Sequence, residues 1–496
     1  MSDIKIKYKD TVNIKIECER GIAKEISDYF TFKVPGHQYM PSFKNKVWDG
    51  QIKLYNMYTE ELYAGLLEYI LKFAEERNYT LELDSKLKEP KRKINIDAFL
   101  SLMNLTVSGE NITPHQHQLN AINHAMHNDR CLLLSPTGSG KSLMIYCLLR
   151  HYLNIIPPDK KVLIIVPTTS LVTQMMSDFD DYSKKENWNA RGTCHTVMSG
   201  KDKLDKNKRV VISTWQSIYK LRKEYFDNFG AVFGDECHLF KAKSLTSIMT
   251  KLHDCPYRIG TTGTLDESQT HKLVIEGLFG QIFNVTSTKD LMDKDLLSKL
   301  EIDTILLKYD DKEKEEVKRA KYQDELDWLV RNTKRNNFIK DMALKLKGNT
   351  LILFQYVEKH GKVLHSIIRK GAEDGRKVFF VHGGTDVEIR EEIRHITEKE
   401  DDAIIIASYG TFSTGISIRR LHNIIFASPS KSRIRVLQSI GRQLRKSDNK
   451  DVAKLYDIGD DLSWKSWKNH TLRHFLSRIK IYESENFKFN SIVIRI

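Results

Sequence analysis

The sequence has few cysteines and no long apolar segment, and both absences limit what the protein can be. Its cysteines are too far apart for a zinc cage or a disulfide framework. They are Cys18, Cys131, Cys147, Cys194, Cys237 and Cys255. The longest aliphatic runs, such as Val162 to Val166, have only the length of a strand, and internal repeats are absent. These features predict a reduced, cytoplasmic protein that is neither secreted nor membrane-spanning.

The composition is that of a globular chain with a surplus of positive charge. The chain has 496 residues, of which 40% are hydrophobic and 29% are charged. This length predicts roughly two to four domains. Lys and Arg number 79 against 65 Asp and Glu, which gives a formal charge of +14. Such a surplus favours a polyanionic partner such as nucleic acid, although many basic proteins bind none.

Residues 1–90 predict a small α+β unit. Within 45–55, Asp49-Gly50 stands between two runs of alternating apolar residues, which predicts a β-hairpin with a tight turn. Within 60–76, apolar residues recur at three- and four-residue spacing, which predicts a helix packed on that hairpin. The charged segment 84–93 contains a proline and few apolar residues, so we expect a linker there.

From about residue 110 onward, short aliphatic runs alternate with helical stretches. Uninterrupted aliphatic strands between helices are typical of a parallel sheet that is covered on both faces. The pattern occurs twice, so we expect two consecutive α/β domains, with helices of the segment 312–346 packed on the second. The expected strands are 131–134, 162–166, 210–213, 231–233, 350–354, 377–381, 403–407 and 423–426.

A phosphate-binding loop is predicted at residues 135–142, SPTGSGKS, between an apolar strand and a helical run. Two glycines let backbone N–H groups turn toward an anion, and the following helix adds the positive end of its dipole. Lys141 supplies a charge for the β- and γ-phosphates, and Ser142 can ligate Mg²⁺. Ser135 stands where the full pattern has a glycine, which leaves the branch of P-loop ATPases open. The expected nucleotide-binding residues of the loop are Thr137, Gly138, Ser139, Gly140, Lys141 and Ser142.

A pair of carboxylates ends another apolar strand further along the chain. Asp235 can hold Mg²⁺, and Glu236 can accept a proton from an attacking water. Adjacent carboxylates in a turn are usually surface charge, but on a strand after a phosphate loop they are more often catalytic. The loop and the carboxylates together predict ATP and Mg²⁺ as cofactors.

Taken in order, the motifs resemble those of the superfamily 2 helicases with a DExH box. Residues 114–116, PHQ, resemble the stretch whose glutamine reads adenine, which gives that role to Gln116. Residues 261–264, TTGT, take the place of motif III, and residues 438–445 match the QxxGRxxR pattern of motif VI. By the same resemblance, the residues that contact the nucleic-acid strand are Pro167, Thr168, Gln174, Thr214, Trp215, His382, Gly383 and Thr411.

The resemblance implies an architecture and a mechanism. It implies an α/β fold with two tandem RecA-like parallel-sheet domains after a small α+β domain. The implied limits are a substrate-recognition domain at 1–90, an ATP-binding domain at 91–290 and a second RecA-like domain at 291–496. Arg442 and Arg445 are implied to be arginine fingers that join Lys141, Asp235 and Glu236 in catalysis. Because the fingers come from another domain than Lys141, hydrolysis would require ATP to close the cleft between the lobes.

Over nearly its full length the chain resembles the branch-migrating DNA helicases of bacteriophages. The likeness rests on the strings NKVWDGQIKLY, IIVPTTSLVTQM, GDECHL, ASYGTFSTGIS and LQSIGRQLRK. It implies an ATP-hydrolysing enzyme, monomeric in isolation, that unwinds and branch-migrates forks, Holliday junctions and R-loops in recombination and repair. An RNA helicase is an alternative. A binding module with a decayed ATP site is another, but all the expected catalytic residues are present.

Two features leave their roles open. Trp48, at the tip of the predicted hairpin, is either a wedge against a DNA junction or a core residue. The segment 461–496 interleaves basic and aromatic residues, which suits phosphate neutralisation and base stacking. The same segment also fits a helix that packs its aromatic side chains on the second lobe.

Overall fold

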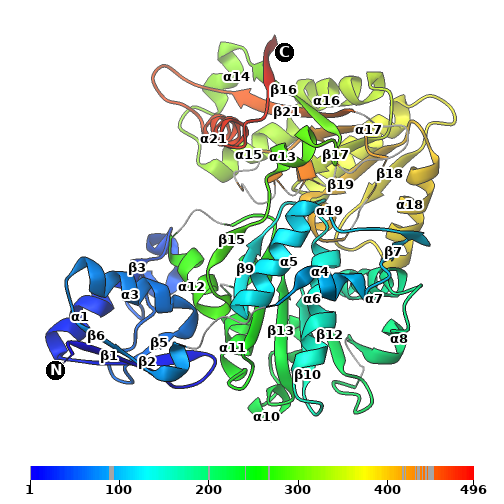
Figure 1. Ribbon diagram of the computed structural model, residues 1–496. Coiled ribbons are helices and arrows are strands. Elements are labelled where there is room, and N and C mark those ends of the chain that lie inside the picture. Colours follow the sequence, from blue (N-terminus) through cyan, green and yellow to red (C-terminus); the bar gives the residue numbers. More distant parts are fainter. Residues whose placement is uncertain are drawn as a thin grey trace. The chain divides into compact units, whose positions relative to one another are not determined.

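The computed structural model describes residues 2–88, 94–198, 202–240, 242–265, 269–415, 420–429 and 452–496, and within the gaps residues 418, 432, 436, 437, 439–441 and 444. The chain divides into two compact units, residues 1–135 with 139–286 and residues 287–496 with 136–138 (Figure 1). Every helix in the described part of the chain is too short or too polar to cross a lipid bilayer.

The amino-terminal part of the first unit contains a four-stranded sheet in the order β5-β2-β1-β6. Alternate isoleucines of the two central strands are buried against helices α1 and α3, as expected for a sheet with one covered face. The elements are β1 (Ile4–Tyr8), β2 (Asn13–Cys18), α1 (Arg20–Tyr29), β3 (Thr31–Lys33), α2 (Pro41–Lys44), β4 (Gln51–Lys53), β5 (Glu61–Tyr63), α3 (Leu67–Glu76) and β6 (Leu81–Leu83).

Two local predictions for this part are wrong. The hairpin expected over 45–55 does not form, because β4 pairs antiparallel with the earlier strand β3 and the residues between them include the helix α2. Gly50 does adopt a positive φ of 78°, but it ends a long loop instead of a tight turn. The helix expected over 60–76 begins only at Leu67, because residues 61–63 pair with β2 as strand β5.

A parallel seven-stranded sheet forms the rest of the first unit, in the order β11-β12-β10-β13-β14-β9-β15. Alternate residues of β10 belong to two cores: Leu163 and Ile165 face one, and Ile164 and Val166 face the other. The strands are β9 (Arg130–Leu134), β10 (Lys161–Val166), β11 (Cys194–Val197), β12 (Val210–Thr214), β13 (Phe229–Asp235), β14 (Tyr257–Thr262) and β15 (Ile282–Asn284).

Helices cover both faces of this sheet, as its uninterrupted aliphatic strands predict. A short hairpin of β7 (Thr106–Val107) and β8 (Glu110–Asn111) precedes it. The helices are α4 (Ile96–Ser101), α5 (Gln116–Asn128), α6 (Lys141–Ile155), α7 (Thr169–Tyr182), α8 (Ala190–Thr193), α9 (Trp215–Ile218), α10 (Lys223–Phe226), α11 (Lys243–Lys251) and α12 (Gln269–Phe279).

The amino-terminal part is docked on this sheet through a shared core. Thr11, in the turn between β1 and β2, donates from Oγ1 to the carbonyl of Leu252 at 2.9 Å and accepts from the backbone N–H of Cys255 at 3.1 Å. A second contact between the two parts is made by the Tyr69 hydroxyl, which donates to Glu276 at 2.7 Å. Both contacts are part-buried or buried, so the two parts are joined as one body.

The second unit contains another parallel seven-stranded sheet, in the order β18-β19-β17-β20-β21-β16-β22. Together the two sheets confirm the predicted fold class, although β11, β14, β15, β16, β21 and β22 were not among the expected strands. The strands are β16 (Lys299–Lys308), β17 (Thr350–Phe354), β18 (Val378–Val381), β19 (Ile404–Ser408), β20 (Asn423–Phe426), β21 (Val452–Asp461) and β22 (Phe489–Arg495).

The segment 312–346 forms helices whose apolar stripe packs on this sheet, as predicted. The carboxy-terminal segment contains helix α21, in which Leu472 and Phe475 are buried, and this supports core packing of its aromatic residues over base stacking. The helices that the described residues of this unit form are α13 (Thr288–Asp293), α14 (Asp311–Glu316), α15 (Tyr322–Arg331), α16 (Thr333–Lys345), α17 (Lys362–Gly371), α18 (Val387–Lys399), α19 (Tyr409–Gly415) and α21 (His470–Ser484).

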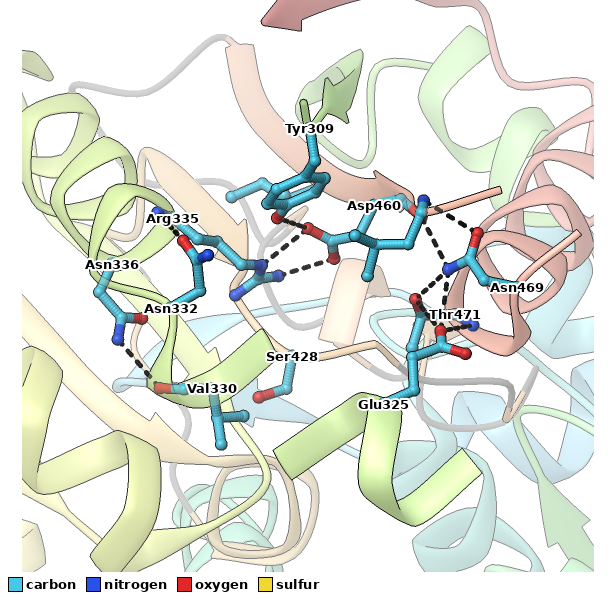
Figure 2. Close-up of polar contacts among 12 residues, drawn as sticks. Tyr309, Glu325, Val330, Asn332, Arg335, Asn336, Ser428, Asp460, Asn469 and Thr471 are labelled. Atoms are coloured by element: carbon cyan, nitrogen blue, oxygen red, sulfur yellow. Dashed lines mark hydrogen bonds and ion pairs between the residues drawn. The ribbon is translucent and has the colours of Figure 1, made fainter. Parts of the chain in front are cut away.

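A buried polar network joins α15, α16 and α21 to the end of β21 (Figure 2). Asp460 accepts from Arg335 Nε at 2.8 Å, from Arg335 Nη2 at 3.1 Å and from the Tyr309 hydroxyl at 2.7 Å. Glu325 accepts from Asn469 Nδ2 at 2.8 Å and from Thr471 at 2.7 Å. Each of the two buried carboxylates therefore has several partners, as burial of an ionised group requires.

Candidate active site

The predicted phosphate loop lies between the end of β9 and the start of α6. Gly138 and Gly140 have φ values of 89° and 83°, a conformation that residues with a Cβ rarely adopt. Lys141, the first residue of α6, donates from Nζ to the Ser135 carbonyl at 3.2 Å. The loop thus has the backbone geometry, the helix start and the cation that a bound triphosphate requires.

A glutamine holds this loop, and it is Gln118, two residues after the Gln116 that is predicted to read adenine. Gln118 is buried in α5 and donates from Nε2 to the Ser139 carbonyl at 2.9 Å. Gln116 lies on the exposed face and donates to Asn120 of the same helix. Helical periodicity could have chosen between them, because Gln118 shares its face with the buried residues Ala121, Ile122 and Ala125.

The two glutamines form a matched pair for mutagenesis. Gln118→Ala is expected to lower kcat/KM for ATP by about tenfold, because it removes a buried hydrogen bond that positions the loop. Gln116→Ala should change kcat/KM by no more than about twofold, as most surface substitutions do. Steady-state ATPase assays across ATP concentrations measure both values. A larger loss in the Gln116 variant would support the predicted adenine contact of Gln116 and contradict the importance of Gln118.

The carboxylate of Asp235 lies at the end of β13, beside β14. It accepts from Thr261 Oγ1 at 2.8 Å and from the backbone N–H of Glu236 at 3.0 Å. Burial, and next the neighbouring charge of Glu236, raise the pKa of Asp235, while the positive charge of Lys141 lowers it. A divalent cation beside this carboxylate would favour its ionised form, which suits a magnesium ligand.

Glu236 occupies a left-handed conformation with φ of 53°, which is uncommon for a residue other than glycine. Its Oε2 atom lies 3.3 Å from Nδ1 of His238, and that nitrogen lies 3.0 Å from Thr262 Oγ1. The predicted motif III therefore contacts both acidic residues, Asp235 directly and Glu236 through His238. The sequence string GDECHL contains His238, but its link to Thr262 depends on the pairing of β13 with β14.

The residues present fit a nucleotide with Mg²⁺ better than a metal held by protein alone. Within the described residues, no cluster of three or more His, Cys, Asp or Glu side chains could hold a metal ion. Mg²⁺ in nucleotide sites needs only one or two protein ligands, because phosphates and water supply the rest. Ser142, which also bonds the Tyr182 hydroxyl at 2.9 Å, and Asp235 are the residues that could provide them.

In the first unit, four of the five residues predicted to contact the nucleic-acid strand lie at the carboxyl ends of β10 and β12, and the fifth, Gln174, lies in α7. The ends of β10 and β12 pair in register, with Val166 opposite Thr214. Gln216 donates to the Pro167 carbonyl at 3.4 Å, which ties the two motifs together. The five predicted residues differ in exposure, since Gln174 is exposed, Pro167, Thr168 and Trp215 are half-buried, and Thr214 is buried.

The second unit's residues that are predicted to contact nucleic acid also differ in exposure. Gly383 follows β18 and faces open space, next to the half-buried His382. Thr411 is buried in α19, and its hydroxyl bonds Ser408 Oγ at 2.8 Å, so its side chain does not face solvent. The predicted arginine fingers Arg442 and Arg445 lie outside the described residues.

Two parallel seven-stranded sheets, with a phosphate loop and an Asp-Glu-Cys-His turn in the first, define a superfamily 2 helicase. Family models agree: "DNA helicase UvsW, N-terminal" matches residues 3–84, "Type III restriction enzyme, res subunit" residues 111–267, and "Helicase conserved C-terminal domain" residues 333–447. The chain is 35% identical over 505 residues to the ATP-dependent DNA helicase uvsW of Enterobacteria phage T4, covering 98% of each protein. The chain therefore belongs to the UvsW helicase family.

Two further comparisons agree with this assignment. The crystal structure of T4 UvsW is 34% identical to the chain and covers 99% of both chains, with a TM-score of 0.53. The DNA 3'-5' translocase XPB2 of Sulfurisphaera tokodaii is 24% identical over 454 residues, covering 85% of this chain and 93% of that protein. Sequence likeness to DNA motors thus extends through all three parts of the chain.

Proposed function

We propose that the protein is an ATP-hydrolysing DNA helicase that acts on branched DNA. The observation that carries the proposal is the direct bonding of both motif III threonines to the catalytic turn, Thr261 to Asp235 and Thr262 to His238. A turn that only bound nucleotide would not need this connection to the neighbouring strand. A motor does, because phosphate release has to alter contacts with the track.

In this mechanism the loop and the acidic turn have separate tasks. The backbone N–H groups of the loop and Lys141 bind the phosphates, and Gln118 keeps the loop in place. Ser142 and Asp235 would hold Mg²⁺, which when bound would supply positive charge beside the phosphates. Glu236 accepts the proton of the attacking water, and His238 orients its carboxylate. We propose Arg442 and Arg445 as the residues that stabilise charge on the γ-phosphate, on the strength of their motif.

We propose that the bound nucleic acid runs across the carboxyl ends of β10 and β12. Motif III is connected to these strand ends through β13, which lies between β14 and β10 in the sheet. Contacts there would be made to the DNA backbone, so we expect little sequence preference and strong salt dependence. The net charge of +14 agrees with a polyanionic track.

We propose that the amino-terminal part recognises branches, forks, Holliday junctions and R-loops among them. It is docked on the motor sheet through Thr11 and Tyr69, so a branch bound there would be held at a fixed place relative to the ATP site. We further propose a monomer that works in the host-cell cytoplasm, as the relation to a phage helicase suggests.

The test compares substrates with the full-length protein. We expect unwinding and ATPase stimulation by forked DNA and Holliday junctions to exceed those by linear duplex, and RNA duplex to give neither. Equal activity on linear and branched DNA would overturn the branch preference, and activity on RNA alone would support an RNA helicase. Deleting residues 1–90 is not a suitable control, because it would expose the core shared with the motor sheet.

A further inference from the structure

A pocket of about 740 Å³ lies in the amino-terminal part, remote in sequence from every helicase motif. Its walls come from α1 and from the chain between β4 and β5, and they include Arg20, Lys24, Lys53 and Tyr58. The volume falls within the range of small-molecule sites, roughly 300–1,000 Å³. Residues of this pocket have no part in the proposed ATP site.

The ring of Tyr58 is exposed to solvent, and hydrogen bonds hold the turn that carries it. The side chain is 99% exposed, so it contributes almost nothing to the core. Asn56 Oδ1 accepts from the backbone N–H of Tyr58 at 2.9 Å and of Thr59 at 3.3 Å. Backbone hydrogen bonds between Asn56 and Glu61 close the turn. The backbone under the ring is therefore ordered before any ligand arrives, which lowers the entropic cost of stacking.

The charges around the ring favour an anion. Lys24 is ion-paired with Asp28 at 2.6 Å and Lys53 with Asp49 at 3.5 Å, but all four side chains are more than half exposed. Exposed pairs of this kind contribute little to stability, so a phosphate can replace the carboxylates at little cost. Glu60, an acid on the same wall, is ion-paired with Lys15 at 3.2 Å.

We propose that this pocket, named here the Tyr58 pocket, binds an unpaired nucleotide at a DNA branch. The base stacks on the Tyr58 ring, and the adjoining phosphates bind Lys24 and Lys53. An exposed ring selects unpaired bases, because within a duplex both faces of each base are already covered by neighbouring bases. The inference rests on the proposed action on branched DNA and names the feature of the branch that is recognised.

Binding of full-length protein to three forks tests the pocket. The forks carry an oligo-dT flap, an abasic flap of equal length, or no flap. Tyr58→Ala is expected to weaken binding to the dT-flap fork by roughly tenfold and to leave binding to the abasic-flap fork unchanged. Tyr58→Trp should retain the preference for dT. Tyr39→Ala is the matched control, since Tyr39 is 73% exposed but does not line the pocket.

Chemical labelling of Cys18, which also lines the Tyr58 pocket, gives a second measurement of ligand binding. Cys18 is half-buried, whereas the five other cysteines are buried, so a maleimide should label it first. We expect the dT-flap fork to slow labelling of Cys18 more than the abasic-flap fork does. An unchanged labelling rate with bound dT-flap fork, or equal loss of affinity in the Tyr39 and Tyr58 variants, would overturn the pocket. A wild-type protein that binds none of the three forks more tightly than linear duplex would instead overturn the proposed function.

Discussion

Lys141→Ala is expected to lower kcat for ATP hydrolysis by roughly 10²- to 10³-fold, which corresponds to about 3–4 kcal/mol of transition-state stabilisation. Lys141 is the first residue of α6, and its Nζ donates a hydrogen bond to the carbonyl oxygen of Ser135 in the phosphate loop. Its charge is therefore placed where negative charge develops on the phosphates. DNA binding at low salt should be nearly unchanged, because the proposed strand contacts lie at the ends of β10 and β12.

Steady-state ATPase assays and fluorescence anisotropy with labelled DNA measure the two properties separately. Glu236→Gln should lose a similar factor in kcat while retaining ATP affinity, because the amide keeps its volume and loses only the base. Lys184→Ala is the matched control, since Lys184 is 53% exposed and pairs only with the nearby Asp181 in the described structure. Hydrolysis at the wild-type rate in the Lys141 or Glu236 variant would remove the assignment of the active site.

Arg335→Leu is expected to destabilise the second unit by about 3–5 kcal/mol, because it leaves the Asp460 carboxylate charged and buried without its main partner. Arg335 is fully buried, and its guanidinium contacts both oxygens of Asp460 (Figure 2). The Tyr309 hydroxyl, which also donates to Asp460, cannot replace a full charge. Urea unfolding followed by fluorescence measures the change in the free energy of unfolding of this unit.

The adjacent residue supplies the control for that measurement. Lys334 forms ion pairs with Asp310 and Glu313, but its side chain is 51% exposed, so Lys334→Ala should lower the free energy of unfolding far less than Arg335→Leu does. The double variant Arg335→Met with Asp460→Leu should recover much of the lost stability, because it leaves no buried charge behind. Equal destabilisation by Arg335→Leu and Lys334→Ala would contradict the importance of burial.

The hairpin shows where local sequence reasoning failed, and the two glutamines show what it left open. Both Gln116 and Gln118 precede the same apolar run, and only the side of α5 that packs decides which one meets Ser139. Asp49-Gly50 carries a strong turn signal, yet β4 pairs with β3, because a strand binds the partner that the fold brings beside it. The expected start of α3 was early for the same reason, since residues 61–63 are recruited by β2.

The sequence by itself determined the two parallel sheets, the phosphate loop and the acidic turn. These features are local: aliphatic runs form buried strands, and a few consecutive residues form a loop that binds phosphate through its own backbone. Only the tertiary structure decided that Gln118 holds the loop, that His238 joins Glu236 to Thr262, and that Phe475 is buried. Each of these depends on contacts between residues far apart in the chain, and periodicity cannot specify which surfaces will meet.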